Sequence, residues 1–148
     1  MKKVWILFLL LMGLFLVGCG TANKTAQTNS DGKGIVAGEM VATLKEDSRL
    51  VFQYEVKNQT EKEVPLEFTS SQRFDYSVES KEGEEIFLFS SVTSFLQIVG
   101  EETVKQGESL SYEIDLHDLE LQTGSYVLTV WLTPKDGKAY QVKKEFTL

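Results

Sequence analysis

The chain has 148 residues, about the length of one domain, with 15 basic and 22 acidic side chains and a formal net charge of −7. This acidity disfavours binding to nucleic acid and to anionic lipid surfaces, so we expect no nucleic-acid partner. Cys19 is the only cysteine and His117 the only histidine. An internal disulfide and the usual zinc sites are therefore excluded, and we expect no metal and no other cofactor.

The first 18 residues have the features of an export signal. Met1–Lys3 is basic, and the next 15 residues, Val4–Gly18, contain no charge and no side-chain amide. A membrane-spanning helix needs about 20 apolar residues, whereas the apolar part of a signal peptide has about 7–15. We therefore expect residues 1–18 to be a removable signal peptide.

The signal ends in Leu16-Val17-Gly18-Cys19, which resembles the lipobox of bacterial lipoproteins. The thiol of Cys19 would accept a diacylglyceryl group, and the small Gly18 would allow cleavage between these two residues. The alternatives are an ordinary secretory signal or a short anchor with an unrelated cysteine, but charge, length, small residue and cysteine all fit the lipoprotein. This predicts a lipid-anchored protein on the cell membrane, facing outside the cytoplasm. Losing two lysines with the signal would lower the net charge to −9.

Residues 19–34 differ in composition from the rest of the chain. The stretch after the cysteine, Gly20–Gly34, has no large apolar side chain and is rich in Gly, Thr, Asn and Ser. Such a segment cannot bury apolar surface, so we expect a disordered tether that reaches roughly 20 Å on average. Residues 35–148 remain as a single domain.

From Ile35 onward, apolar residues recur with a period of two, which is typical of strands with one face in a core. Turn-forming residues separate these stretches, and no window of ten residues predicts an amphipathic helix. Seven to nine short strands predict an all-β fold, an antiparallel β-sandwich of immunoglobulin-like type. The clearest alternating stretches are 50–56, 64–68, 74–78, 110–116 and 126–132, with Trp131 on the opposite face of the last.

No set of residues for catalysis emerges from the sequence, so we expect no enzyme and no catalytic residue. His117 lies between Asp115 and Asp118, but sequence neighbours on a strand do not form a catalytic triad, and a solvated loop is the simpler interpretation. A pair of carboxylates for glycoside hydrolysis stays open, although nothing singles one out. The sequon Asn58-Gln59-Thr60 is interpreted as a turn in which the Asn side chain bonds to nearby backbone.

Residues 85–99 carry apolar side chains on both faces. Ile86 and Leu88 would point one way and Phe87 and Phe89 the other, and a second apolar run follows from Phe95. One interpretation is a central strand, or a loop folded over the sandwich edge, that buries the aromatic rings. The other is an exposed aromatic patch that docks a partner.

The stretch from Leu50 to the C-terminus resembles the BsuPI family of intracellular proteinase inhibitors. The best match is Phe68–Tyr76, similar to the family's F-x-S-G-Q-x-Y-D-F, followed by Gly83–Ser90, similar to G-x-x-V-W-x-W-S, and by Phe95-Leu96-Gln97, similar to F-x-Q. The chain departs from the family at a few positions: Ser71 stands in place of Gly, Phe87 and Phe89 in place of Trp, and Gln106 in place of Pro.

The resemblance implies a β-sandwich and proteinase inhibition. The inhibitor would act by occlusion, with a rigid sandwich presenting a loop or an aromatic edge to a protease cleft. The alternative is an envelope module that binds another protein and inhibits nothing. The residues that we expect to contact a partner are Phe87, Phe89, Phe95, Gln97, Gln72 and Arg73.

Overall fold

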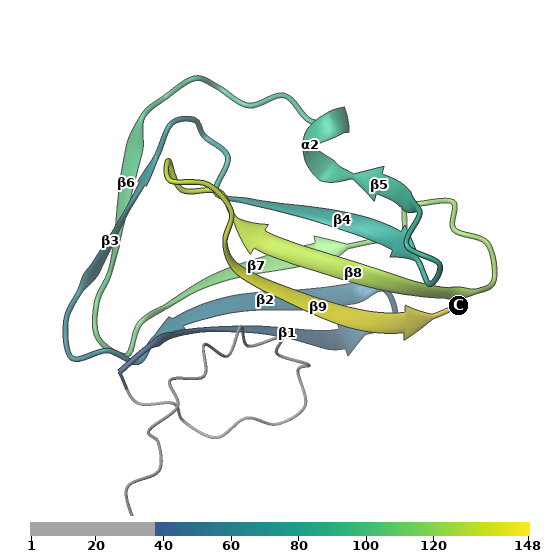
Figure 1. The fold of residues 1–148 in the computed structure, drawn as a ribbon, viewed down its shortest axis with the longest axis horizontal. Coiled ribbons are helices and arrows are strands. Elements are labelled where there is room, and N and C mark those ends of the chain that lie inside the picture. Colours follow the sequence, from purple (N-terminus) through teal and green to yellow (C-terminus); the bar gives the residue numbers. More distant parts are fainter. Residues whose placement is uncertain (1–37) are drawn as a thin grey trace, which may run out of the picture.

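The computed structural model describes residues 38–148 (Figure 1). The predicted signal peptide 1–18, the predicted lipidation site Cys19 with its neighbour Gly18, and the predicted tether 19–34 lie outside the described residues. Within that range the chain forms nine strands and one short helix, α2 (Phe89–Val92). The strands are β1 (Met40–Ser48), β2 (Val51–Asn58), β3 (Val64–Phe68), β4 (Phe74–Ser80), β5 (Glu85–Leu88), β6 (Gly100–Val104), β7 (Ser109–Asp115), β8 (Ser125–Leu132) and β9 (Ala139–Thr147).

The strands form three antiparallel groups. A four-stranded sheet has the order β5-β4-β8-β9, a three-stranded sheet has the order β1-β2-β7, and β3 pairs with β6. Figure 1 shows the four-stranded sheet above the three-stranded one, with the β3–β6 pair across one end. This is the predicted all-β sandwich, and it has the nine strands at the upper end of the predicted number.

The alternating side chains of the two sheets meet in one core. Phe52, Tyr54 and Val56 of β2 are fully buried, and Leu128 and Val130 of β8 are buried from the opposite sheet. This burial follows from the period of two, because every second side chain of a strand points to the same face. The predicted pattern of inward-facing residues is confirmed in these two strands.

Direct contacts of two kinds, aromatic packing and a hydrogen bond, join the two sheets. The rings of Phe52 and Phe146 have centroids 5.4 Å apart in an edge-to-face arrangement. The Tyr54 hydroxyl donates a hydrogen bond of 2.7 Å to the carbonyl of Tyr140. Burial raises the pKa of this hydroxyl well above its ordinary value, so Tyr54 stays neutral and its proton remains available for the bond.

The outer face of the four-stranded sheet is less exposed than the alternation predicted. Trp131 points away from the core, as expected, yet it is buried, with the Lys138 ammonium 3.7 Å above its ring centre. Ser77 and Thr129 on the same face are buried as well. Their strands β4 and β8 are the two central strands of the sheet, so each of them has a neighbouring strand on both sides.

The sequon Asn58-Gln59-Thr60 forms the predicted turn. Asn58 is fully buried; its Oδ1 accepts the Thr60 N–H at 2.9 Å, and its Nδ2 donates to the carbonyls of Lys62 and Val104. The side chain therefore fastens the end of β2 to the β3–β6 pair.

The short α2 agrees with the expectation that no long amphipathic helix forms. Between residues 38 and 148, none of the helical structure has the length and apolar character needed to cross a membrane.

Candidate functional site

Exposed large apolar side chains are concentrated in residues 86–99, which we call the apolar segment. Within residues 38–148, every large apolar residue in the exposed class belongs to it: Ile86, Val92, Leu96, Ile98 and Val99. Leu96 is 66% exposed and Val99 78%. Figure 1 shows the part of this segment between α2 and β6 arching along the top of the molecule.

The apolar segment starts on an edge strand and then leaves the sheet. In β5, Phe87 pairs with Val78 of β4, while Ile86 next to it is exposed. After α2 the chain runs without regular secondary structure from Thr93 to Val99 and then enters β6. Four of the five residues of Phe95–Val99 are apolar, and such a stretch cannot bury all of its side chains on one surface, so Leu96, Ile98 and Val99 remain exposed.

The three phenylalanines of the segment pack on the sandwich. The ring centroid of Phe89 lies 5.0 Å from that of Tyr76 and 5.8 Å from that of Phe95. The ring centroid of Phe87 lies 5.7 Å from that of Tyr76. Phe87, Phe89 and Phe95 are all half-buried, and the first two pack against the core. These rings therefore fasten the segment to the domain, as in the interpretation of a loop folded over the edge. The large apolar side chains that the segment exposes are aliphatic, and a contact between the three rings and a partner stays a prediction.

Backbone hydrogen bonds hold the segment at two further points. The buried carboxylate of Asp75 accepts the N–H of Ser90 at 3.0 Å. Ser71 holds Leu96 on both sides: the Ser71 N–H donates to the Leu96 carbonyl at 2.8 Å, and the Ser71 hydroxyl accepts the Leu96 N–H at 3.0 Å. The aliphatic side chains are thus presented on a backbone that is fixed to the β3–β4 loop.

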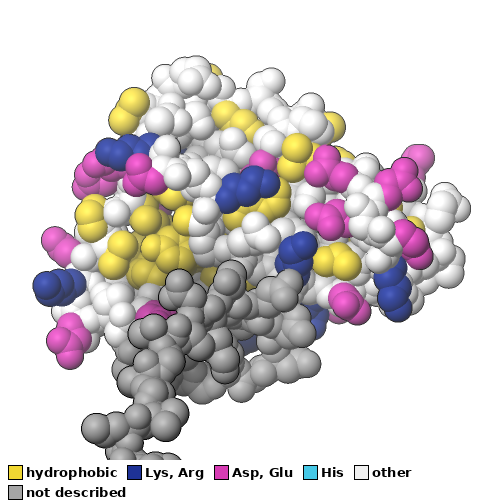
Figure 2. All heavy atoms as spheres, in the orientation of Figure 1, with side chains coloured by type: hydrophobic (Ala, Val, Ile, Leu, Met, Phe, Trp, Pro, Cys, Tyr) yellow, Lys and Arg dark blue, Asp and Glu magenta, His cyan; other side chains and the backbone are white. Residues whose placement is uncertain are grey.

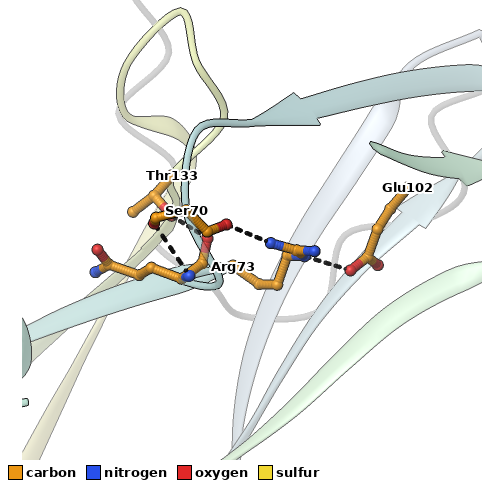
Figure 3. A network of polar contacts seen from close by, with 5 residues as sticks. Ser70, Arg73, Glu102 and Thr133 are labelled. Carbon is orange, nitrogen blue, oxygen red and sulfur yellow. Dashed lines mark hydrogen bonds and ion pairs between the residues drawn. The ribbon is translucent and has the colours of Figure 1, made fainter. Parts of the chain in front are cut away.

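Arg73 joins this loop to β6 (Figure 3). Its Nε donates to Glu102 at 2.5 Å, its Nη1 donates to the carbonyl of Ser70 at 2.7 Å, and its guanidinium lies 4.6 Å from the centre of the Phe68 ring. A Cβ on Gly100 would come within 2.7 Å of the Arg73 guanidinium, so a larger residue there would require the guanidinium to shift. These contacts give Arg73 an intramolecular role beside the apolar segment.

The other two predicted contact residues differ in their surroundings. Gln97 is exposed in the middle of the apolar segment. Gln72 is half-buried, and its side-chain Nε2 donates to the backbone carbonyl of Phe74 at 3.3 Å. The backbone carbonyl of Gln72 accepts a hydrogen bond from the Thr133 hydroxyl at 3.2 Å. All six predicted residues therefore lie either in the β3–β4 loop or in the apolar segment, which the hydrogen bonds between Ser71 and Leu96 join.

Acidic side chains border the apolar segment. Glu84 and Glu85 precede it and Glu101 follows it, and all three are exposed. On the face shown in Figure 2, acidic and basic side chains are dispersed without a continuous basic patch. The surface thus combines aliphatic side chains with a negative border.

The residues considered for other chemistry lie elsewhere. The exposed His117 contacts Asp115 at 2.6 Å, and the backbone N–H of His117 is the main cause that holds the pKa of Asp115 below its ordinary value. No group of three or more His, Cys, Asp or Glu side chains suited to a metal ion occurs in residues 38–148.

The comparison with protein families identifies the chain. The model of the BsuPI family, described as intracellular proteinase inhibitor, matches residues 38–137, about two thirds of the chain. The chain therefore belongs to the BsuPI family, and the family description names an inhibitor, not an enzyme. A search among curated proteins found no match.

Proposed function

We propose that this protein is a membrane-anchored, extracytoplasmic proteinase inhibitor or protease-binding module that acts by occluding a protease cleft through the apolar segment. One observation carries the proposal: a domain of an inhibitor family exposes its large apolar side chains in a single segment, residues 86–99, within the part of the chain that the structure describes. Clustered exposed apolar side chains are characteristic of surfaces that bind a partner.

The architecture supports a rigid contact. The apolar segment is held by half-buried phenylalanine rings and by backbone hydrogen bonds to Asp75 and Ser71. A surface that is ordered before binding loses less conformational entropy when the complex forms. The sandwich can therefore present Leu96, Ile98 and Val99 without rearranging.

The charges around the segment favour one kind of occupant. Exposed Glu84, Glu85 and Glu101 would repel the same border on a second copy of this chain and would also repel an anionic lipid surface. They suit a protease whose apolar cleft is flanked by basic side chains. We therefore expect the complex to weaken as salt concentration rises, because salt screens the charges at its border.

Inhibition assays test this function. The purified chain, kept in solution with a mild detergent, is added in excess to a panel of secreted subtilisin-like serine proteases acting on a chromogenic peptide. Occlusion predicts that hydrolysis slows stoichiometrically for at least one enzyme. Equal rates with and without the chain across the panel would reject inhibition, and capture of an envelope protein without protease activity would support the non-inhibitory alternative.

A matched pair of variants locates the contact. The double variant Leu96→Asp and Val99→Asp places charge on the exposed apolar surface and should abolish inhibition. The variant Ser111→Asp places a charge at an exposed position of β7 in the other sheet and should inhibit like the wild type. If Ser111→Asp abolished inhibition and the double variant inhibited like the wild type, the contact would lie on the three-stranded sheet instead.

The location is proposed from the N-terminal sequence. Two or more acyl chains on Cys19 would give stable anchoring, since each buried methylene contributes about 0.8 kcal/mol. Strand β1, the first described strand, lies on the lower side of Figure 1, whereas the arch between α2 and β6 lies along the top, so an anchor that precedes β1 would leave the apolar segment accessible to a partner. Labelling cells with a palmitate analogue should mark the wild type in the membrane fraction and leave Cys19→Ser unmarked. An unmarked wild-type protein would contradict the anchor.

A further inference from the structure

We infer that Leu96 is the anchor that enters the apolar pocket of the bound protease and that Ser71 is the residue that positions it. The inference rests on the proposed function, and it assigns roles to two residues that the family description does not mention. Both lie outside the set of six predicted contact residues.

Three hydrogen bonds hold the backbone of Leu96, an exposed aliphatic residue of the apolar segment. Its N–H donates to the Ser71 hydroxyl at 3.0 Å, and its carbonyl accepts the N–H of Ser71 at 2.8 Å and that of Ile98 at 2.9 Å. The side chain nevertheless is 66% exposed. A large apolar side chain held outward on a fixed backbone has the properties of a binding hot spot, because little freedom remains to be lost on binding.

The same hydrogen bonds protect the inhibitor from the enzyme that it binds. A protease cleaves an extended segment by pairing with its backbone and by stabilising the oxyanion that forms at the scissile carbonyl. The N–H and carbonyl of Leu96 already have partners within the domain, so cleavage next to Leu96 would first require these bonds to break. Leu96 can therefore fill a pocket without its peptide bond being hydrolysed.

Ser71 is one of the positions at which the chain departs from the family pattern that it resembles. The family pattern similar to Phe68–Tyr76 has glycine at the position of Ser71. Glycine would keep the backbone N–H that donates to the Leu96 carbonyl, but it has no hydroxyl to accept the N–H of Leu96. The serine thus adds the second of the two bonds that close the contact.

The experiment compares inhibition constants for the full-length protein and its variants against an inhibited subtilisin-like protease, and it detects cleavage within residues 93–99 by mass spectrometry. Leu96→Ala should weaken inhibition roughly 30-fold, as expected for a hot spot. Ser71→Ala and Ser71→Gly should weaken it roughly three- to tenfold and allow cleavage of the segment. Ser71→Thr keeps a hydroxyl and should restore both inhibition and resistance.

Ser111→Ala is the matched control, because Ser111 is an exposed serine of β7 outside the apolar segment, and it should behave like the wild type. Thermal unfolding of every variant separates a local effect from loss of the fold. Ser71→Ala that inhibits like the wild type and stays intact would overturn the role of Ser71, and unchanged inhibition by Leu96→Ala would overturn the anchor. A wild-type chain that inhibits no enzyme would instead reject the proposed function, and the anchor with it.

Discussion

Replacing Phe89 with alanine separates packing from partner contact in the apolar segment. The ring lies 5.0 Å from Tyr76 and 5.9 Å from Phe74, and it also contacts Phe95 edge-to-face. Truncating a fully buried Phe to Ala costs about 3–5 kcal/mol. Since Phe89 is half-buried, we expect the free energy of unfolding to fall by about 2 kcal/mol.

Urea denaturation followed by tryptophan fluorescence measures this change, because the buried Trp131 reports on the fold. For a domain of this size, a loss of about 2 kcal/mol also lowers the melting temperature by about 10 °C. Leu96→Ala is the control: its side chain is largely exposed, so its free energy of unfolding should change by less than about 0.5 kcal/mol. A Phe89→Ala protein as stable as the wild type would refute the assignment of Phe89 to packing.

Three further predictions concern the described domain. Asn58→Ala removes the three hydrogen bonds of a buried side chain and should lower the free energy of unfolding in urea by about 3 kcal/mol, whereas a change below about 1 kcal/mol would contradict its role. Arg73→Lys keeps the charge but cannot donate to both Ser70 and Glu102, so we expect the free energy of unfolding to fall by about 1 kcal/mol, also in 1 M salt. An unchanged free energy of unfolding would show that a single donor is sufficient. Burial raises the pKa of Tyr112 to about 12 from 10.0, so the stability that it contributes is complete below pH 10 and is lost as pH rises towards 12. The urea midpoint should fall over this range less steeply for Tyr112→Phe than for the wild type, and equal slopes would contradict the assignment.

Much of the fold could be predicted from alternation along the strands. In β2 and β8 every second residue is apolar, and the structure buries those side chains in one core. The burial of Trp131 and Thr129 on the outer face could not be predicted in this way. It depends on the position of β8 between β4 and β9, which is a property of sheet order and not of local sequence.

The candidate site was predictable as a region but not residue by residue. Apolar side chains on both faces of residues 85–99 marked a segment that cannot be an ordinary half-buried strand. The sequence did not show which of them remain in water, because that depends on the rings of Tyr76 and Phe74 that receive Phe89. The role of Ser71 was also not predictable, since its partner Leu96 lies 25 residues away along the chain.

The proposed function requires that the apolar segment forms the contact with a protease. Hydrogen–deuterium exchange of the complex between the chain and an inhibited subtilisin-like protease tests it most directly. We predict slower exchange in peptides that cover residues 86–99 and the adjoining β3–β4 loop, with unchanged exchange in β1, β2 and β7. Protection confined to β1, β2 and β7, with residues 86–99 exchanging as in the free protein, would contradict the account.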